Sequence, residues 1–178
     1  MTRAQDPRPC PTLPACVDTD VETGTARPLR VVIDSAVVTS ALVFGGAPSA
    51  RLRRAWQRGF CRPMVCKSTL MDLQHMLADA RLGFSAQEVM RMLGEYLPYV
   101  LKVRVPEAAR PGDGIPDTLP FVQLAMAGKA HVLVTADPPL LNARHGLPFA
   151  VMPLDPFLDL LRTSAIAPTP LRGAKTPR

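Results

Sequence analysis

Four aspartates occupy positions from which their carboxylates could act together on one substrate. They are Asp34, Asp72, Asp117 and Asp137. Two of them closely follow short apolar runs, 29–33 and 132–134, of the kind found in strands buried inside a parallel sheet. The other two belong to helical patterns, one inside a helix and one at an N-cap. An α/β sheet would bring these positions to one cleft, because ligands bind beyond the carboxyl ends of its strands.

Clustered carboxylates favour the chemistry of a divalent metal ion. Two carboxylates about 4 Å apart repel each other by about 4 kcal/mol at an effective dielectric constant of about 20, so protons or cations must neutralise them. Mg²⁺ and Mn²⁺ suit such oxygen ligands, and metal-dependent hydrolysis of a phosphodiester follows as the favoured reaction. Aspartates at strand ends and helix N-caps are also ordinary structural residues. The interpretation as a structural residue is strongest for Asp117 and weakest for Asp34 and Asp137.

The segments that must position these carboxylates alternate between strand and helix patterns. Strand-like runs occur at 30–38, where the β-branched stretch 29–33 ends at Asp34, and at 100–105, 131–135 and 149–152. Helical spacing of apolar residues occurs at 49–58, from 68, from 85, between 117 and 128, and from 155. This alternation predicts an α/β fold.

Length and composition favour one domain between two tails. The sequence has 178 residues, of which 47% are hydrophobic, enough for one buried core and too few for two ordinary ones. Residues 1–28 and 163–178 are Pro-rich without apolar periodicity, so we expect disordered tails around a domain at 29–162. No apolar run approaches the roughly 18 residues of a membrane span and no signal-peptide pattern is present, so we expect a cytoplasmic protein with no membrane contact.

The remaining residue types exclude several other kinds of site. The 4 cysteines lack the spacing of a zinc site and the density of a disulfide scaffold, so we interpret them as ordinary thiols. The 3 histidines have no metal-ligand spacing, and the Gly-rich stretch lacks the lysine of a P-loop. Aromatic residues make up only 5%, which disfavours a base-stacking sheet as the main means of binding RNA.

The net charge of +6 suits a polyanionic partner such as nucleic acid. The densest basic patch lies in the helical pattern at 49–58. Its members are Arg51, Arg53, Arg54 and Arg58. We interpret them first as the solvated face of an amphipathic helix, because exposed helix faces are usually charged, with contact to RNA phosphates as the alternative.

Several short runs, in a fixed order, resemble those of a known family. They are VVIDSAVVTSAL at 31–42, the segments 68–77 and 117–127, and LVTAD at 133–137 followed by Leu140 and Leu141. With the closing segment 151–158 they resemble a PIN-domain protein, in particular the VapC-like ribonuclease toxins of type II toxin–antitoxin pairs. The resemblance covers about residues 29–162. It implies a three-layer fold with a small, mainly parallel central sheet flanked by helices.

The resemblance also implies a role for each aspartate, as catalytic residue and metal ligand of an endoribonuclease that uses Mg²⁺ or Mn²⁺. Asp34 falls on the family's first acidic position, at the end of strand one, and Asp72 on the second. Asp117 falls on the third, with Asp113 as the alternative, and Asp137 on the fourth.

Two hydroxyl residues are expected to support these carboxylates. Thr135, in the Thr-x-Asp element, would orient Asp137 or a metal-bound water. Ser35 directly follows Asp34.

Three positions differ from the family's usual pattern. Ala36 stands where the family has Asn, Asp72 where it usually has Glu, and Pro139 where a second acidic residue is common. These differences keep a second function open, a catalytically degenerate PIN-fold protein that binds RNA or a protein partner. For the active toxin, the resemblance implies an RNA substrate, an antitoxin that covers the cleft with a basic side chain, and a homodimer.

Overall fold

The computed structural model of the protein describes residues 28–105, 120–142 and 146–166. The predicted tails lie almost wholly outside these residues. The last helix, α7 (Leu154–Ile166), runs past the domain boundary that we predicted at residue 162. Among the described residues, no helix is long and apolar enough to cross a membrane.

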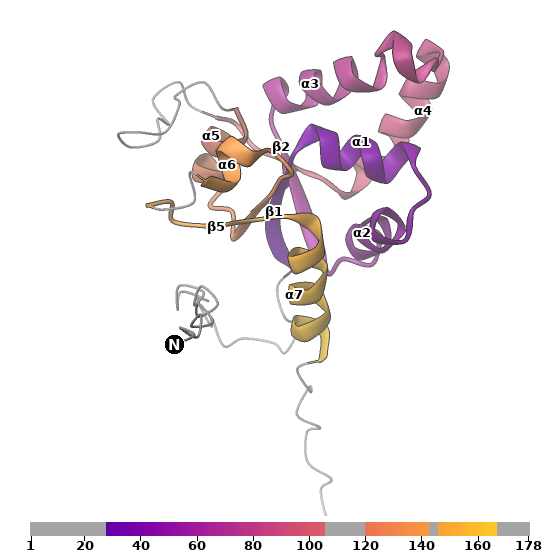
Figure 1. Ribbon diagram of the computed structural model, residues 1–178. Helices are drawn as coiled ribbons and strands as arrows, with labels where there is room; N and C mark the ends of the chain where they lie inside the picture. The colour runs from indigo at the N-terminus through magenta and orange to yellow at the C-terminus, as the bar shows by residue number, and fades with distance from the viewer. Residues whose placement is uncertain (1–27, 106–119, 143–145, 167–178) are drawn as a thin grey trace, which may run out of the picture.

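A parallel sheet of five strands forms the centre of the fold (Figure 1), and its spatial order is β3-β2-β1-β4-β5. The strands are β1 (Leu29–Ile33), β2 (Cys61–Val65), β3 (Leu101–Lys102), β4 (Val132–Val134) and β5 (Ala150–Met152). The central pair, β1 and β4, aligns Ile33 with Val134. The residues that follow these two strands therefore lie side by side at the carboxyl edge.

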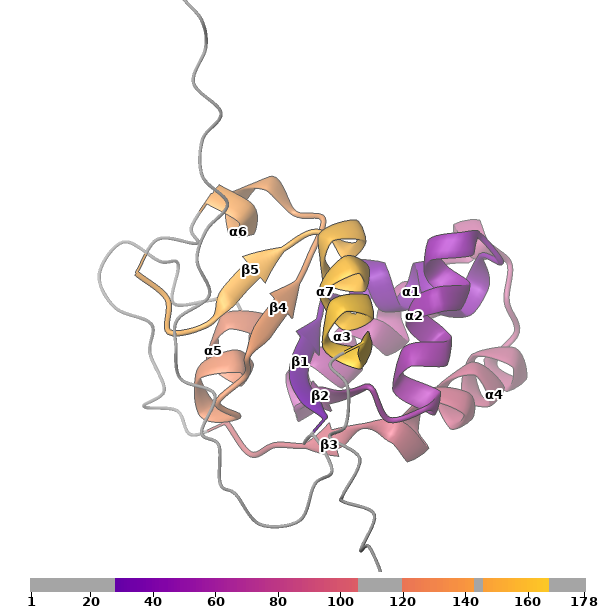
Figure 2. The same cartoon turned by 90° about the horizontal axis from the view of Figure 1, so that it is seen from below.

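Helices cover both faces of this sheet and make the three-layer α/β fold that the sequence predicts. Besides α7 they are α1 (Ser35–Val43), α2 (Ala47–Gln57), α3 (Lys67–Leu77), α4 (Ala86–Tyr96), α5 (Pro120–Ala127) and α6 (Pro138–Asn142). Two short 3₁₀ turns, Ala80–Leu82 and Leu97–Tyr99, flank α4. Figure 2 shows α5 and α6 on one side of the sheet and α1, α2 and α7 on the other.

Each face of the sheet has its own core, because successive strand residues point to opposite faces. On one face Val31, Ile33 and Val134 pack with apolar residues of α1, α2, α3, α4 and α7. On the other face Val32 and Leu133 pack with residues of α5 and α6. All five strand residues are almost completely buried.

The predicted strand-like run at 30–38 was wrong in its second half, because residues from Ser35 onward form helix α1. The side chain of Asp34 accepts a hydrogen bond from the backbone N–H of Ala36 and caps this helix. Most residues of α1 are buried, and its exposed residue, Ala36, is itself apolar, so the sequence has no contrast between faces that would show a helical period. Tertiary packing therefore overrides the β-branched composition of this stretch.

Two strands differ from the sequence expectations. β2 was missed, because it contains Arg62 and Pro63, and proline is rare inside sheets. Pro63 is tolerated at this position because β2 pairs with β3 only from Met64 onward. β3 lies at the sheet edge, as predicted, but is only two residues long instead of spanning 100–105.

Candidate active site at the carboxyl ends of β1 and β4

Asp34 lies at the carboxyl end of the central strand β1, and its half-buried carboxylate is held in place from two sides. Its Oδ1 atom accepts the backbone N–H of Ala36 at 3.0 Å. Its Oδ2 atom accepts the hydroxyl of Thr135 at 2.7 Å. The backbone N–H of Asp34 also donates to the carbonyl of Val134 at 2.9 Å, which continues the pairing between β1 and β4. The carboxylate orientation is thus set by both strands and by α1.

Thr135 is completely buried and joins the two aspartates. Its hydroxyl donates to Asp34 and accepts the backbone N–H of Asp137 at 3.0 Å. A threonine hydroxyl has one hydrogen, and here that hydrogen is used by Asp34. Thr135 was predicted to orient Asp137 or a metal-bound water. In the structure it orients the Asp34 carboxylate and the backbone of Asp137.

Asp137 lies beside this arrangement, at the start of α6. Its carbonyl accepts the backbone N–H of Leu141 at 3.0 Å, and the residue is partly exposed. In the part of the chain that the structure describes, no hydrogen bond or ion pair occupies its carboxylate. Asp34 and Asp137 therefore bring two partly exposed carboxylates to the carboxyl ends of neighbouring strands.

Of the other predicted acidic residues, only Asp72 is among those that the structure describes, and no hydrogen bond or ion pair among these residues joins it to this centre. Asp72 is exposed on α3. Asp113 and Asp117 lie outside the described residues. Within 28–105, 120–142 and 146–166, no group of three or more His, Cys, Asp or Glu side chains is arranged to hold a metal ion. The four-carboxylate site thus stays a prediction. The structure places Asp34 and Asp137 at the carboxyl ends of neighbouring strands.

Comparison with known proteins identifies the family. A family model described as the PIN domain matches residues 30–138, which is more than half of the chain. The chain belongs to the PIN-domain family. This family is generally a metal-dependent nuclease fold, and its members typically use divalent metal ions.

A solved structure has a similar fold. The chain is similar to PAE2754 from Pyrobaculum aerophilum, with 21% sequence identity, a TM-score of 0.50, and coverage of 86% of this chain and 99% of that chain. At this identity the similarity concerns the fold alone. No curated protein gave a match.

The residues next to Asp34 have separate roles in this PIN domain. Ser35 is buried, and its hydroxyl donates to the carbonyl of Thr69 at 3.5 Å, a long contact that joins α1 to α3. Its observed contact is therefore with the packing of α3 rather than with a carboxylate. Ala36 is exposed, so the position of the missing asparagine is open to solvent beside Asp34.

A second feature at the carboxyl edge of the PIN domain was missed from the sequence. A hollow of about 590 Å³ lies near the ends of β2 and β3, and its lining includes Cys66, Lys67 and Arg104. Burial raises the pKa of the Cys66 thiol, but hydrogen bonds from Ser68 and Thr69 lower it by more, so its pKa lies below the usual value. A helix that begins directly after a strand could have indicated this hollow from the sequence, but β2 itself was not predicted.

The basic patch of α2 is divided between two environments. Arg53 is half-buried and forms an ion pair with Glu95 of α4 at 3.1 Å. Its guanidinium also donates to the carbonyl of Leu42 at 3.4 Å. Arg51, Arg54 and Arg58 are exposed. The predicted solvated face thus holds for three of the four arginines, whereas Arg53 links two helices.

Proposed function

We propose that this PIN domain is an endoribonuclease that hydrolyses RNA phosphodiester bonds with a divalent metal ion, and that it acts in the cytoplasm as the toxin of a toxin–antitoxin pair. The observation that carries the nuclease proposal is the chain of contacts from Asp34 through the Thr135 hydroxyl to the backbone of Asp137. It holds two carboxylates at the ends of adjacent central strands, where ligands bind in open α/β sheets.

The donor atoms of this centre fit Mg²⁺ or Mn²⁺. Both ions prefer oxygen ligands, and Mg²⁺ keeps several waters while binding through one or two carboxylates plus phosphate oxygens. Asp34 and Asp137 would hold the metal, with Asp72 and Asp117, or Asp113, as further predicted ligands. A bound divalent ion would supply a more acidic water as nucleophile and would neutralise charge on the phosphate.

The chain's own residues contribute preorganisation. The two hydrogen bonds to Asp34 fix its carboxylate before any substrate binds, and the Thr135 donor is fully buried, so water does not compete for it. The N-terminus of α1, which Asp34 caps, directs its partial positive charge toward the same edge and favours an approaching phosphate.

The partners follow from the same proposal. Exposed carboxylates at the cleft would attract a basic side chain of an antitoxin, which would replace the charge of the metal and block the site. An RNA substrate and a homodimer complete the proposed partners. Crystallisation with a cognate antitoxin tests this point, and a complex in which the antitoxin leaves Asp34 and Asp137 uncovered would contradict it.

The test of the nuclease proposal is cleavage of a mixed RNA pool by the purified full chain with Mn²⁺. The comparison is an Asp34→Asn, Asp137→Asn double variant, matched for folding by circular dichroism. An Asp79→Asn, Glu88→Gln double variant is the matched control, because Asn and Gln keep the side-chain oxygens that accept the cap hydrogen bonds from Arg81 and Ser85. We expect cleavage by the wild type and the control, none by the site variant, and loss of cleavage on chelation.

The opposite result has a defined meaning. If the folded wild type, free of antitoxin, cleaves neither RNA nor single-stranded DNA, the nuclease proposal fails. The chain would then be the alternative, a PIN-fold protein that binds RNA or a protein without cleaving. If the site variant cleaves RNA as fast as the wild type, either another part of the chain or a contaminating nuclease is responsible.

A further inference from the structure

A shallow groove lies between α2 and α7, on the far side of the domain from Asp34. Its volume is about 210 Å³. Its polar lining residues are all arginines. We call it the arginine groove and define it by Arg51, Arg54, Arg58, Arg162 and the aromatic residue Phe60. Apolar atoms of Ala55, Leu158 and Leu161 line the remainder.

The charge of this groove is almost uncompensated. The side chains of Arg51 and Arg58 have no hydrogen-bond or ion-pair partner within the part of the chain that the structure describes. Among the same residues, the side chain of Arg54 donates only to the carbonyl of Ala50, at 3.3 Å. Arg162 has a carboxylate partner, Asp159, at 3.4 Å, and both side chains are largely exposed. Surface pairs of this kind contribute little, so the groove stays strongly positive.

The spacing of the groove arginines distinguishes them from Arg53, the arginine of α2 that links two helices. Arg51, Arg54 and Arg58 are three and four residues apart, so they form one stripe along α2. Arg53 lies off this stripe and is neutralised by Glu95. A helix face that served only as a solvated surface could carry acidic as well as basic residues. This stripe carries no carboxylate. The stripe is therefore suited to a row of anionic groups.

Phe60 adds an aromatic surface to this positive groove. Its side chain is 48% exposed. Gly59, with φ of 76°, makes the turn that leads to it, and the backbone N–H of Phe60 donates to the carbonyl of Ala55 at 3.0 Å. An exposed ring among arginines matches single-stranded nucleic acid, which combines phosphates with stacking bases.

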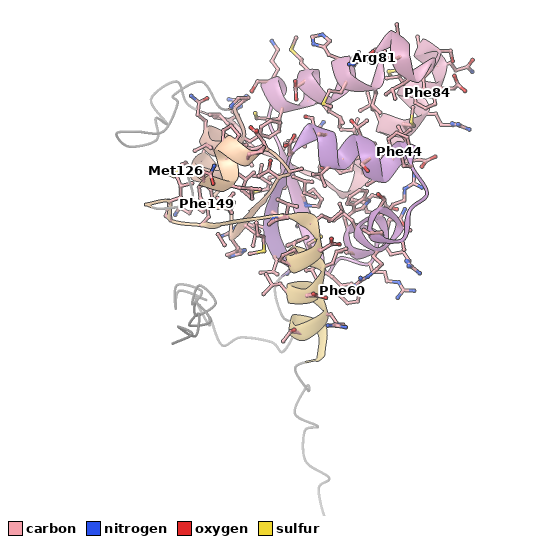
Figure 3. The ribbon with its side chains drawn as sticks, in the orientation of Figure 1. Phe44, Phe60, Arg81, Phe84, Met126 and Phe149 are labelled. Atoms are coloured by element: carbon pink, nitrogen blue, oxygen red, sulfur yellow. The ribbon has the colours of Figure 1, made fainter. Side chains whose placement is uncertain are left out.

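The groove lies at the amino edge of the sheet, opposite the candidate active site. The carbonyl of Phe60 accepts the N–H of Leu29, the first residue of β1, whereas Asp34 follows the last residue of that strand. The length of β1, roughly 16 Å at about 3.3 Å per residue, separates the two places. Figure 3 shows Phe60 beside α7, at the opposite end of the molecule from Arg81.

We propose that the arginine groove is a second RNA-binding surface, which holds a single-stranded segment of the substrate away from the cleavage site. Its arginines would contact phosphates, and Phe60 would stack on one base. The choice of RNA as ligand rests on the proposed function, but binding to the groove does not require cleavage. The groove would raise affinity for longer RNA without taking part in the reaction.

The experiment measures binding of fluorescent oligouridine, roughly 12 nucleotides long, to the full chain by anisotropy. An Asp34→Asn background and EDTA prevent cleavage. The test variant is Arg51→Gln, Arg58→Gln, which removes two charges without breaking an observed contact. The matched control is Arg91→Gln, Lys102→Gln, which removes two charges from exposed residues of α4 and β3, elements that do not line the groove.

We expect the test variant to bind about tenfold more weakly at moderate salt, with the control close to wild type. The slope of log affinity against log salt should fall by about 1.4, because each phosphate contact with a single strand contributes about 0.7. Phe60→Leu should weaken binding about fivefold or more, whereas Phe60→Tyr, which keeps the ring, should not.

Four results would overturn the proposal. They are no binding by the wild type, equal binding by the test variant and the wild type, an equal loss in the control, and competition by polyglutamate as effective as that by unlabelled oligouridine. The last result would assign the groove to an acidic protein instead. Binding at the groove by a chain that never cleaves RNA would sustain this proposal while the nuclease proposal fails.

Discussion

At the scale of single residues, Thr135 is the group on which the candidate site depends. We expect Thr135→Val to reduce metal-dependent cleavage at least tenfold, because Asp34 loses the hydrogen bond that orients it. Valine has nearly the same shape, so packing is kept. The substitution leaves the N–H of Asp137 without its acceptor, and an unsatisfied buried group costs about 1 to 3 kcal/mol of unfolding free energy. Urea denaturation and cleavage rates measure the two effects.

Thr135→Ser supplies the control for this prediction. Serine keeps the hydroxyl and loses only a methyl group, so we expect most of the cleavage rate to return. If the valine and serine variants lose equal activity, the hydroxyl is not the important feature.

The two cysteines in the described residues should differ in reactivity with pH. Burial raises the pKa of Cys61 to about 12. The pKa of Cys66 is below its usual value, because the hydrogen bonds from Ser68 and Thr69 outweigh its burial. A lower pKa gives more thiolate at a given pH, and thiolate is the reactive form. We therefore expect iodoacetamide to modify Cys66 well before Cys61, with a half-maximal rate below the pH typical of a free thiol, as measured by peptide mass mapping.

Removing the hydrogen-bond donor provides a check. Ser68→Ala should shift the alkylation profile of Cys66 to higher pH, because one stabilising contact of 3.1 Å to the sulfur is lost. Alkylation of Cys61 at the same rate as Cys66 in the folded protein would contradict the assignment.

At the scale of elements, the junction between α5 and β4 shows how a glycine can be required for space. A glycine after a helical run is typical of a left-handed C-cap, but here the positive φ of 50° belongs to Lys129. A Cβ atom on Gly128 would lie 2.8 Å from Sδ of Met64 and 3.1 Å from the carbonyl oxygen of Leu124. Close approach between α5 and β2 therefore explains the glycine.

We expect Gly128→Ala to lower the free energy of unfolding by about 1 to 3 kcal/mol, the usual effect of forcing an extra methyl group into a packed core. A double-mutant cycle with Met64→Ala measures the cause, since the smaller side chain removes the clash. The effect of Gly128→Ala should then largely disappear. Additive effects of the two substitutions would show that backbone conformation, and not contact with Met64, is responsible.

At the scale of the whole molecule, α7 completes the core on its face of the sheet. Phe157, Leu158 and Leu161 are buried against residues of α2 and the central strands. Each buried side chain of this size contributes about 1.5 to 3 kcal/mol, whereas a domain has only about 5 to 15 kcal/mol in total. A chain that ends at Pro153 should therefore lose its cooperative thermal transition.

The matching control is a chain that ends at Ile166. It keeps all of α7, and we expect its melting temperature to stay within a few degrees of that of the full chain. A milder variant, Phe157→Leu, should lower the melting temperature while keeping a cooperative transition, as followed by circular dichroism. An unchanged transition in the chain that ends at Pro153 would show that α7 is not part of the stabilising core.

The elements that could be predicted from sequence are those whose signals are local. The helical pattern predicted from residue 85 is α4, which begins with a capping box whose two hydrogen bonds join Ser85 and Glu88, only three positions apart. Leu52, Ala55 and Trp56 are buried at the helical spacing expected for α2. The elements that could not be predicted are those set by their neighbours. α1 is apolar even at its exposed residue and β2 contains a proline, so neither has the usual pattern.

The sequence by itself determined the α/β class, the family resemblance, and the placement of Asp34 and Asp137 at the ends of strands. These features depend on the order of residues along one segment. Only the tertiary structure decided that the Thr135 hydroxyl donates to Asp34, which is 101 residues away, and that Arg53 pairs with Glu95 while the exposed Arg51 and Arg58 side chains have no partner among the described residues. Such contacts depend on strand register and helix packing, which no single segment contains.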